Sequence, residues 1–217
     1  MAREAASLVL LDDDFGSIVK AVRLGRQIYD NLRKAMSYIL AIHIPIAGLA
    51  LLPLLTGAPL VMTPLLIALL ELLIDPTCSI VFEAEHARPD VMRRPPRRAD
   101  ESIMSARIVW WSSLQGVLAL TAVSIVYSQT TAWGLSAEAV RLCAFLALVS
   151  ASFALVLANR DREVSLASTL GSGNSMLWLS FGLTVAAVAV LTVLPQARAF
   201  FGIALPGAAW TALSVGS

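Results

Sequence analysis

The sequence predicts an all-α polytopic membrane protein, a helical transmembrane bundle, and three observations support that fold class. Of the 217 residues, 58% are hydrophobic and 14% are charged, and the mean hydropathy of +0.76 lies far outside the soluble range. The apolar residues form five runs that are each long enough to cross a bilayer as a helix. Lys and Arg gather in alternate connections between these runs, as they do in the cytoplasmic loops of membrane proteins.

Charge balance and cysteine placement argue against several other classes. The 16 Lys and Arg residues nearly balance the 15 Asp and Glu residues, so net charge does not indicate a nucleic-acid partner. Cys78 and Cys143 each lie inside an apolar run, with no Cys or His at metal-ligand spacing. Neither a disulfide framework nor a zinc site is therefore predicted. The first residues also lack the basic and then apolar pattern of a signal peptide.

Residues 1–35 precede the first apolar run. The apolar stretch at 8–11 predicts a short strand, which the acidic residues Asp12, Asp13 and Asp14 end. A helical pattern follows over 18–35, with basic side chains among apolar ones. Because its cationic end runs directly into the first apolar run, this helix is expected to be a cytoplasmic stalk that enters the membrane.

Residues 36–217 are expected to form the transmembrane domain. Complete spans are predicted at 36–55, 60–82, 108–128, 139–158 and 175–194, with a partial sixth span at 200–217. Pro45 and Pro53 are expected to interrupt the first span. The turn at 56–59 has only four residues, so the first two spans should be antiparallel neighbours.

The connections between spans predict the orientation of the chain. Basic residues occur in the stalk and in the loops at 83–107 and 159–173, whereas 56–59 and 129–138 contain neither Lys nor Arg. The N-terminus is therefore expected in the cytoplasm. In the first of these loops Glu83, Glu85 and Asp90 precede a run of arginines, and such opposite charge blocks favour a solvated docking surface.

Two carboxylates stand in the second span. Asp75 lies near the middle of the run, Glu71 is one helical turn before it, and Pro76 follows directly. Acids at i and i+4 project from one helix face, and Pro76 deprives the carbonyl of Leu72 of its helical donor. An acid at this depth costs several kcal/mol unless it is neutralised, which favours a cation site. The alternative is one protonated acid and one acid paired with a buried base, for which His43 is the obvious candidate.

His43 belongs to the first span. It lies 13 residues before Thr56, and Glu71 lies 12 residues after Pro59, so the two should be at a similar depth. His43, Glu71 and Asp75 are therefore predicted to surround one site for a transported cation, with Asp75 as the principal ligand. A histidine that is hydrogen-bonded within the bundle is an equally good interpretation of His43. No catalytic or cofactor-binding residue is predicted.

Several long motifs resemble the cation-transporting P-type ATPases, and the bacterial calcium-pump-like members in particular. The stretch AREAASLVLLDDDFGSIVKAVRLGRQIYDNLRK is similar to the end of their phosphorylation domain and the stalk of their fifth membrane helix. ELLIDP followed by FEAEHARPDVMRRPPR is similar to their sixth membrane helix and the loop after it. The resemblance implies that the chain holds the fifth to tenth membrane helices and is truncated at both ends.

The resemblance also assigns roles to particular residues. Asp75 falls on the ion-binding aspartate of the family, and Glu71 falls where calcium pumps usually have an asparagine. Ile74 replaces a threonine, while His43 and Ile46 stand where calcium pumps have asparagine and glutamate ligands. With fewer oxygen ligands, a single hard cation or a proton-coupled site fits better than two calcium ions.

The family's catalytic motifs do not occur in these 217 residues. The sequence contains no DKTGT-type phosphorylation motif, no TGE-type motif, no GDGxNDxPAL segment and no nucleotide-binding domain. ATP and Mg²⁺ are therefore expected for a complete pump and not for this chain alone. The expected partners are the transported cation (calcium, another small cation or a proton), the lipid bilayer and, if separately encoded, the N-terminal part of the pump.

The leading hypothesis is the C-terminal membrane part of an ATP-driven cation pump in a bacterial plasma membrane. A stand-alone channel or secondary transporter is the first alternative, although the second half of the sequence contains no repeat of ELLIDP. A regulatory or non-functional pump fragment is the second alternative.

Overall fold

A computed structural model describes residues 14–57, 60–96, 102–160 and 174–207, with the exception of the Asp75 side chain. These residues form helices and turns without a strand. The helices are α2 (Phe15–Thr56), α3 (Pro64–Glu83), α4 (Ala106–Ala132), α5 (Ala137–Arg160), α7 (Ser175–Val193) and α8 (Pro195–Phe201). The first five of these are long and apolar enough to cross a membrane, which confirms the all-α polytopic fold class.

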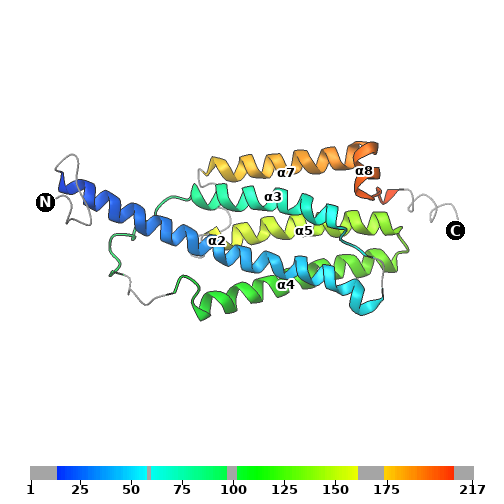
Figure 1. The fold of residues 1–217 in the computed structure, drawn as a ribbon, viewed down its shortest axis with the longest axis horizontal. Coiled ribbons are helices and arrows are strands. Elements are labelled where there is room, and N and C mark those ends of the chain that lie inside the picture. Colours follow the sequence, from blue (N-terminus) through cyan, green and yellow to red (C-terminus); the bar gives the residue numbers. More distant parts are fainter. Residues whose placement is uncertain (1–13, 58–59, 97–101, 161–173, 208–217) are drawn as a thin grey trace, which may run out of the picture.

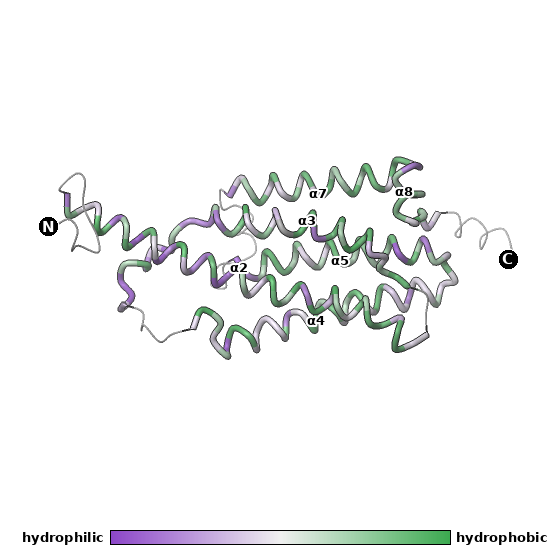
Figure 2. The backbone as a smooth tube through the Cα atoms, in the orientation of Figure 1, coloured by the Kyte–Doolittle hydropathy of each residue, from purple (hydrophilic) through white to green (hydrophobic). Residues whose placement is uncertain are grey.

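The long helices lie side by side, and α2 extends well beyond the others at its N-terminal end (Figure 1). Helix α3 contacts α2, α5 and α7, whereas α4 packs on α2 and α5. Hydrophilic residues concentrate in the projecting part of α2 and in the connection after α3, and apolar residues dominate the bundle (Figure 2). The part of α2 that the sequence predicts as a stalk is thus helical and projects from the bundle, while its role as a cytoplasmic stalk stays a prediction.

The stalk and the first span are one continuous helix of 42 residues. The side chain of Asp14 caps its start by accepting a hydrogen bond from the Gly16 amide at 2.8 Å. Gly57 ends it in the left-handed conformation with φ of 69°, which glycine adopts without a steric penalty. Pro45 and Pro53 lie inside the helix, so the predicted interruption is wrong. Both prolines are buried, and a proline within a membrane helix is tolerated when its surroundings satisfy the freed backbone groups.

Helix α3 begins four residues later than predicted, at Pro64, where Thr63 provides the cap. Val61 and Met62 are buried in the connection before it, so these apolar residues pack on the bundle without being helical. The predicted sixth span is also different within the described residues. Residues 195–201 form the short helix α8, and residues 208–217 lie outside the described part, as does the predicted strand at 8–11.

A glycine sets the close packing of α2 against α4. A Cβ atom added at Gly116 would lie 2.6 Å from the backbone oxygen of Ala41 and 2.6 Å from Cδ1 of Ile44. Real Cβ atoms do not approach that closely, so only glycine allows this separation. Small residues at such contacts are typical of membrane helix pairs.

Candidate cation site

Helix α3 carries the two predicted acids. Pro76 is inside this helix, so the Leu72 carbonyl lacks the amide donor that another residue would provide. The Glu71 side chain is half-buried, while the side chain of Asp75 is outside the described part of the structure. Helix α3 contacts α2, α5 and α7, so the backbone of Asp75 belongs to a helix that is packed against three others.

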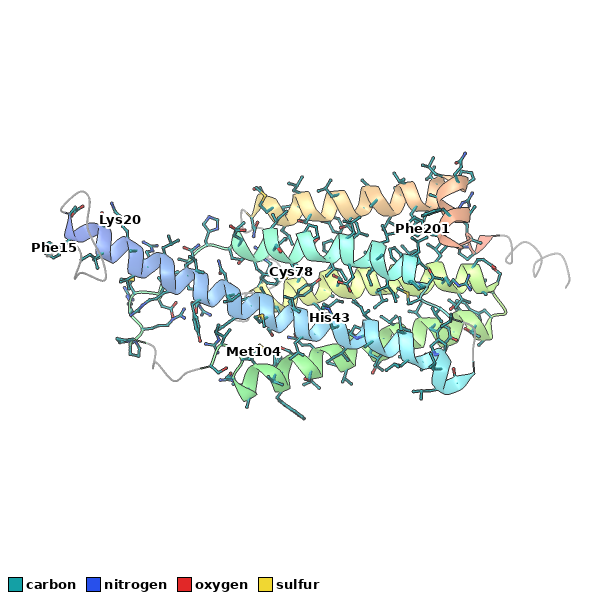
Figure 3. All side chains as sticks on the ribbon, viewed as in Figure 1. Phe15, Lys20, His43, Cys78, Met104 and Phe201 are labelled. Atoms are coloured by element: carbon teal, nitrogen blue, oxygen red, sulfur yellow. The ribbon has the colours of Figure 1, made fainter. Side chains whose placement is uncertain are left out.

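His43 lies on the exposed face of α2, along with Ile39 and Leu51, and not in a helix contact. Figure 3 shows it midway along the bundle. Its Nδ1 atom is 2.7 Å from the carbonyl oxygen of Ile39. Because a carbonyl oxygen only accepts hydrogen bonds, Nδ1 must carry a proton, and in the neutral ring Nε2 keeps the lone pair that binds a cation or proton.

The structure does not test whether His43, Glu71 and Asp75 form one cluster, because the Asp75 side chain is outside the described residues. Among the described residues, no hydrogen bond or ion pair joins His43 to Glu71, and no group of three His, Cys, Asp or Glu side chains could hold a metal ion. The Asp75 side chain lies outside that search, so a site that Asp75 shares with Glu71 and His43 stays a prediction. The described residues provide a half-buried acid (Glu71), a carbonyl that lacks its helical amide donor (Leu72) and an imidazole whose Nδ1 carries a proton (His43).

The connection after α3 contains a buried charge that sequence reasoning missed. Glu85 is only 9% exposed, so its assignment to a solvated surface is wrong. Its Oε1 atom accepts hydrogen bonds from Arg160 Nε at 2.6 Å and from Asn174 Nδ2 at 2.8 Å. Lys34 Nζ is 3.7 Å from the other carboxylate oxygen. We call Glu85, Arg160, Asn174 and Lys34 the stalk junction.

The backbone of Glu85 also belongs to this junction. Its carbonyl oxygen accepts hydrogen bonds from Gln27 Nε2 at 2.8 Å and from Asn31 Nδ2 at 3.0 Å. One residue therefore connects the stalk part of α2 to the ends of α5 and α7. A sequence signal does exist, since Leu70, Ile74, Cys78, Val81 and Glu85 follow helical spacing and all are buried.

Farther along the same connection, Arg94 joins the loop to the stalk. It donates to both carboxylate oxygens of Asp90 and to Asp30 at 2.9–3.0 Å. The hydrogen bond from Arg94 lowers the pKa of Asp90, and the bond to Asp90 raises the pKa of Arg94. Arg26 then holds the loop backbone by donating to the carbonyls of Val91 and Arg94, both at 2.8 Å.

A second polar cluster lies inside the bundle, where α2, α4 and α5 meet. Ser37 Oγ is 2.6 Å from Ser112 Oγ and donates to Asn159 Oδ1 at 2.8 Å. Asn159 Nδ2 donates to Gln115 Oε1 at 2.8 Å. These groups satisfy one another, which favours helix association over ligand binding.

The opposite end of the bundle is held differently. Arg141, in the first turns of α5, donates from Nε to the Leu60 carbonyl at 3.1 Å and from Nη1 to the Gly202 carbonyl at 3.2 Å. The amide of Ala204 donates to the Glu138 carbonyl at 3.2 Å. The α2–α3 connection and the end of α8 are thereby joined to α5.

A bundle of apolar helices with two acids one turn apart in one of them defines a polytopic membrane domain, and acids at such positions are by default a hypothesis of a functional site. Residues 59–217 match the family described as the C-terminus of cation-transporting ATPases. The chain therefore belongs to the family of C-terminal transmembrane domains of cation-transporting P-type ATPases.

Named relatives agree with this family. The chain is 34% identical to a calcium-transporting ATPase of Bacillus subtilis over 131 residues, which cover 58% of the chain and 15% of the relative. It is 29% identical to calcium-transporting ATPase 1 of Lactococcus lactis over 203 residues, 94% of the chain and 23% of the relative. The sodium/potassium-transporting ATPase subunit alpha of Drosophila melanogaster is 36% identical over 110 residues, 50% of the chain and 11% of the relative. The chain thus spans less than a quarter of the length of these relatives.

Proposed function

We propose that this chain supplies the intramembrane cation site of an ATP-driven pump, with Asp75 as the principal ligand. The observation that carries the proposal is that the family match includes the whole of α3, where Glu71 and Asp75 stand one turn apart before Pro76. Carboxylate and carbonyl oxygens suit a hard cation such as calcium. A match of this extent does not favour a stand-alone channel or secondary transporter.

Each residue has its own role in the proposal. Asp75 provides the charge that a desolvated cation needs, and Glu71 provides a second carboxylate or a proton-carrying group. The carbonyl of Leu72, left without its helical donor, offers a neutral oxygen. His43 binds through Nε2 once another helix of the pump covers the exposed face of α2. Because this set has few oxygens, one cation or a proton-coupled cation is proposed instead of two calcium ions.

ATP and Mg²⁺ act outside these residues in the proposal. Phosphorylation in the remaining part of the pump, within the same polypeptide or in a separate one, changes the access of the site from one side of the membrane to the other. The continuous helix α2 and the stalk junction offer a rigid path from that part to α3. The chain alone is proposed to have no ATPase activity.

The proposed location is a bacterial plasma membrane, with the stalk in the cytoplasm. Bacterial relatives support the membrane, and the basic stalk and loops support the orientation. Within the described residues, the stalk, the connection after α3, the end of α5 and the start of α7 meet at one end of the bundle. The described residues at the ends of these segments thus meet on one side of the bundle.

The test is Asp75→Asn in a chimera in which this chain replaces the corresponding part of the Bacillus subtilis relative. An amide of similar size preserves packing but removes the charge, so cation-dependent phosphorylation should be lost. Glu83→Gln is the matched control, since Glu83 is an exposed acid at the end of the same helix. Retained phosphorylation with unchanged cation affinity in Asp75→Asn would refute the proposed role.

A further inference from the structure

A small cavity lies inside the bundle where α3, α5 and α7 meet. Its volume is about 10 Å³, close to the roughly 10–15 Å³ that one water molecule needs. The wall combines aliphatic and aromatic side chains with three hydroxyl-bearing residues, Thr77 of α3, Ser152 of α5 and Thr184 of α7. All three are 4% exposed, so bulk solvent does not hydrate them.

The three hydroxyls differ in what they already bind. Thr77 Oγ1 donates to the Leu73 carbonyl at 2.8 Å, so its oxygen is still able to accept. Ser152 Oγ is 2.7 Å from the Tyr38 hydroxyl, and one further hydrogen bond is possible whichever group donates. Thr184 makes no hydrogen bond to any residue that the structure describes. The Thr184 hydroxyl therefore has a donor that a water molecule in the cavity could engage.

We propose that this cavity is a hydration site that holds one water molecule. The water accepts a hydrogen bond from Thr184 and donates to Thr77 and Ser152. Three partners are typical of a buried water, and each of these partners has the required donor or acceptor capacity. The water would thus connect α3, α5 and α7, whose three hydroxyl groups at the cavity make no direct hydrogen bond to one another.

The position of the site relates it to the candidate cation site. Ile74 and Thr77, which both line the cavity, stand on either side of Asp75 in α3. Through Ser152 the water continues into the hydroxyl of Tyr38 on α2. A polar chain therefore passes from α7 to α2 at the level of the proposed ligand. A water molecule adapts its hydrogen bonds to small helix displacements more readily than a direct contact between side chains.

Thr184→Val in the full chain tests the proposal by the sign of its effect. If water is bound, the variant loses a hydrogen bond and the midpoint of thermal unfolding falls by about 2–4 °C. If the cavity is dry, valine replaces a hydroxyl that bonds to no described residue with a methyl group of nearly the same size, so no hydrogen bond is lost. The midpoint then stays the same or rises, which overturns the proposal.

Thr192→Val is the matched control, because Thr192 lies on the same helix and its hydroxyl bonds only to helix carbonyls. The shift for Thr184→Val is taken relative to this variant. Thr77→Val combined with Thr184→Val should shift the midpoint by less than the sum of the single shifts, since both changes remove partners of the same water. Additive shifts would overturn the proposal.

The water itself is observable in a density map of the chain at about 2 Å resolution or better. A peak within hydrogen-bond distance of Thr77, Ser152 and Thr184 is expected, and its absence would overturn the proposal. None of these measurements involves a cation or ATP. A dry cavity would therefore leave the proposed cation site untouched, and a failure of the Asp75→Asn test would leave the hydration site untouched.

Discussion

An arginine joins several helices at each end of the bundle, but the two arginines use different partners. At the stalk junction Arg160 is 3% exposed and pairs with the buried carboxylate of Glu85. At the far end Arg141 is half-buried and donates to the backbone carbonyls of Leu60 and Gly202. Removal of Glu85 or Arg160 takes the opposite charge away from a buried ion at the first end, whereas removal of Arg141 takes a donor away from two neutral carbonyls at the second.

The comparison shows where the bundle depends on side-chain identity. The stalk junction requires one acid at one position, because a buried guanidinium is costly without a carboxylate. At the far end Arg141 binds backbone carbonyls, so only the path of the backbone at Leu60 and Gly202 matters there, and many side chains would be compatible with that path. The end that faces the proposed ATP-hydrolysing part is thus the more tightly specified one.

The largest expected effect comes from Glu85→Ala. This change leaves Arg160 buried without its carboxylate and should reduce the free energy of unfolding by about 3–5 kcal/mol. Chemical unfolding of the purified chain in detergent measures it. Glu85→Leu combined with Arg160→Met should recover most of the loss, since both charges are then removed. A loss below about 1 kcal/mol in Glu85→Ala would contradict the importance of the junction.

Gly116→Ala should cause the second-largest loss of stability. The added methyl group would meet the backbone of Ala41, which cannot rotate away, so α2 and α4 must separate. Overpacking of this kind costs about 1–3 kcal/mol. Gly182→Ala is the control, because a Cβ atom at Gly182 in α7 meets nothing within 4 Å. Equal stability of the two variants in the same unfolding assay would rule out this close contact.

Arg141→Gln should have a smaller effect, and it tests the comparison directly. The guanidinium is partly hydrated and its partners are neutral, so the expected loss is about 1 kcal/mol. Arg160→Gln, measured alongside it, should lose at least twice as much, because the buried Glu85 carboxylate then keeps only Asn174 and the more distant Lys34 as partners. Equal losses of unfolding free energy in the two variants would show that the two ends do not differ in their dependence on a buried charge pair.

The smallest effect concerns Asp90 and depends on pH. Its pKa is lowered in the folded state by the hydrogen bond from Arg94, so its contribution is present above the unfolded pKa. That contribution is lost as pH falls through the lowered folded pKa, below about pH 4. The difference in unfolding midpoint between the parent chain and Asp90→Asn should therefore shrink between pH 5 and pH 3. A constant difference would show that the pair contributes nothing to stability.

The sequence by itself determined the class of fold and the order of the spans. Apolar runs of sufficient length must be helical in a bilayer because no other structure satisfies their backbone groups, and basic connections mark one side. The position of Glu71 and Asp75 on one helix followed from their spacing. The continuation of α2 through Pro45 and Pro53 did not follow from the sequence, because whether a helix continues through a proline depends on packing that a local pattern does not reveal.

Only the tertiary structure decided which polar residues are buried and what they bind. Glu85 looked like one acid of a charged loop, yet its partners Arg160 and Asn174 come from 75 and 89 residues away. His43 was predicted at the depth of Glu71 but lies on the exposed face of α2, since a count along the sequence predicts position along a helix and not direction around it. The cavity at Thr184 exists because α3, α5 and α7 meet there. The spacing of residues along the sequence does not predict how side chains from separate helices fill the space between them.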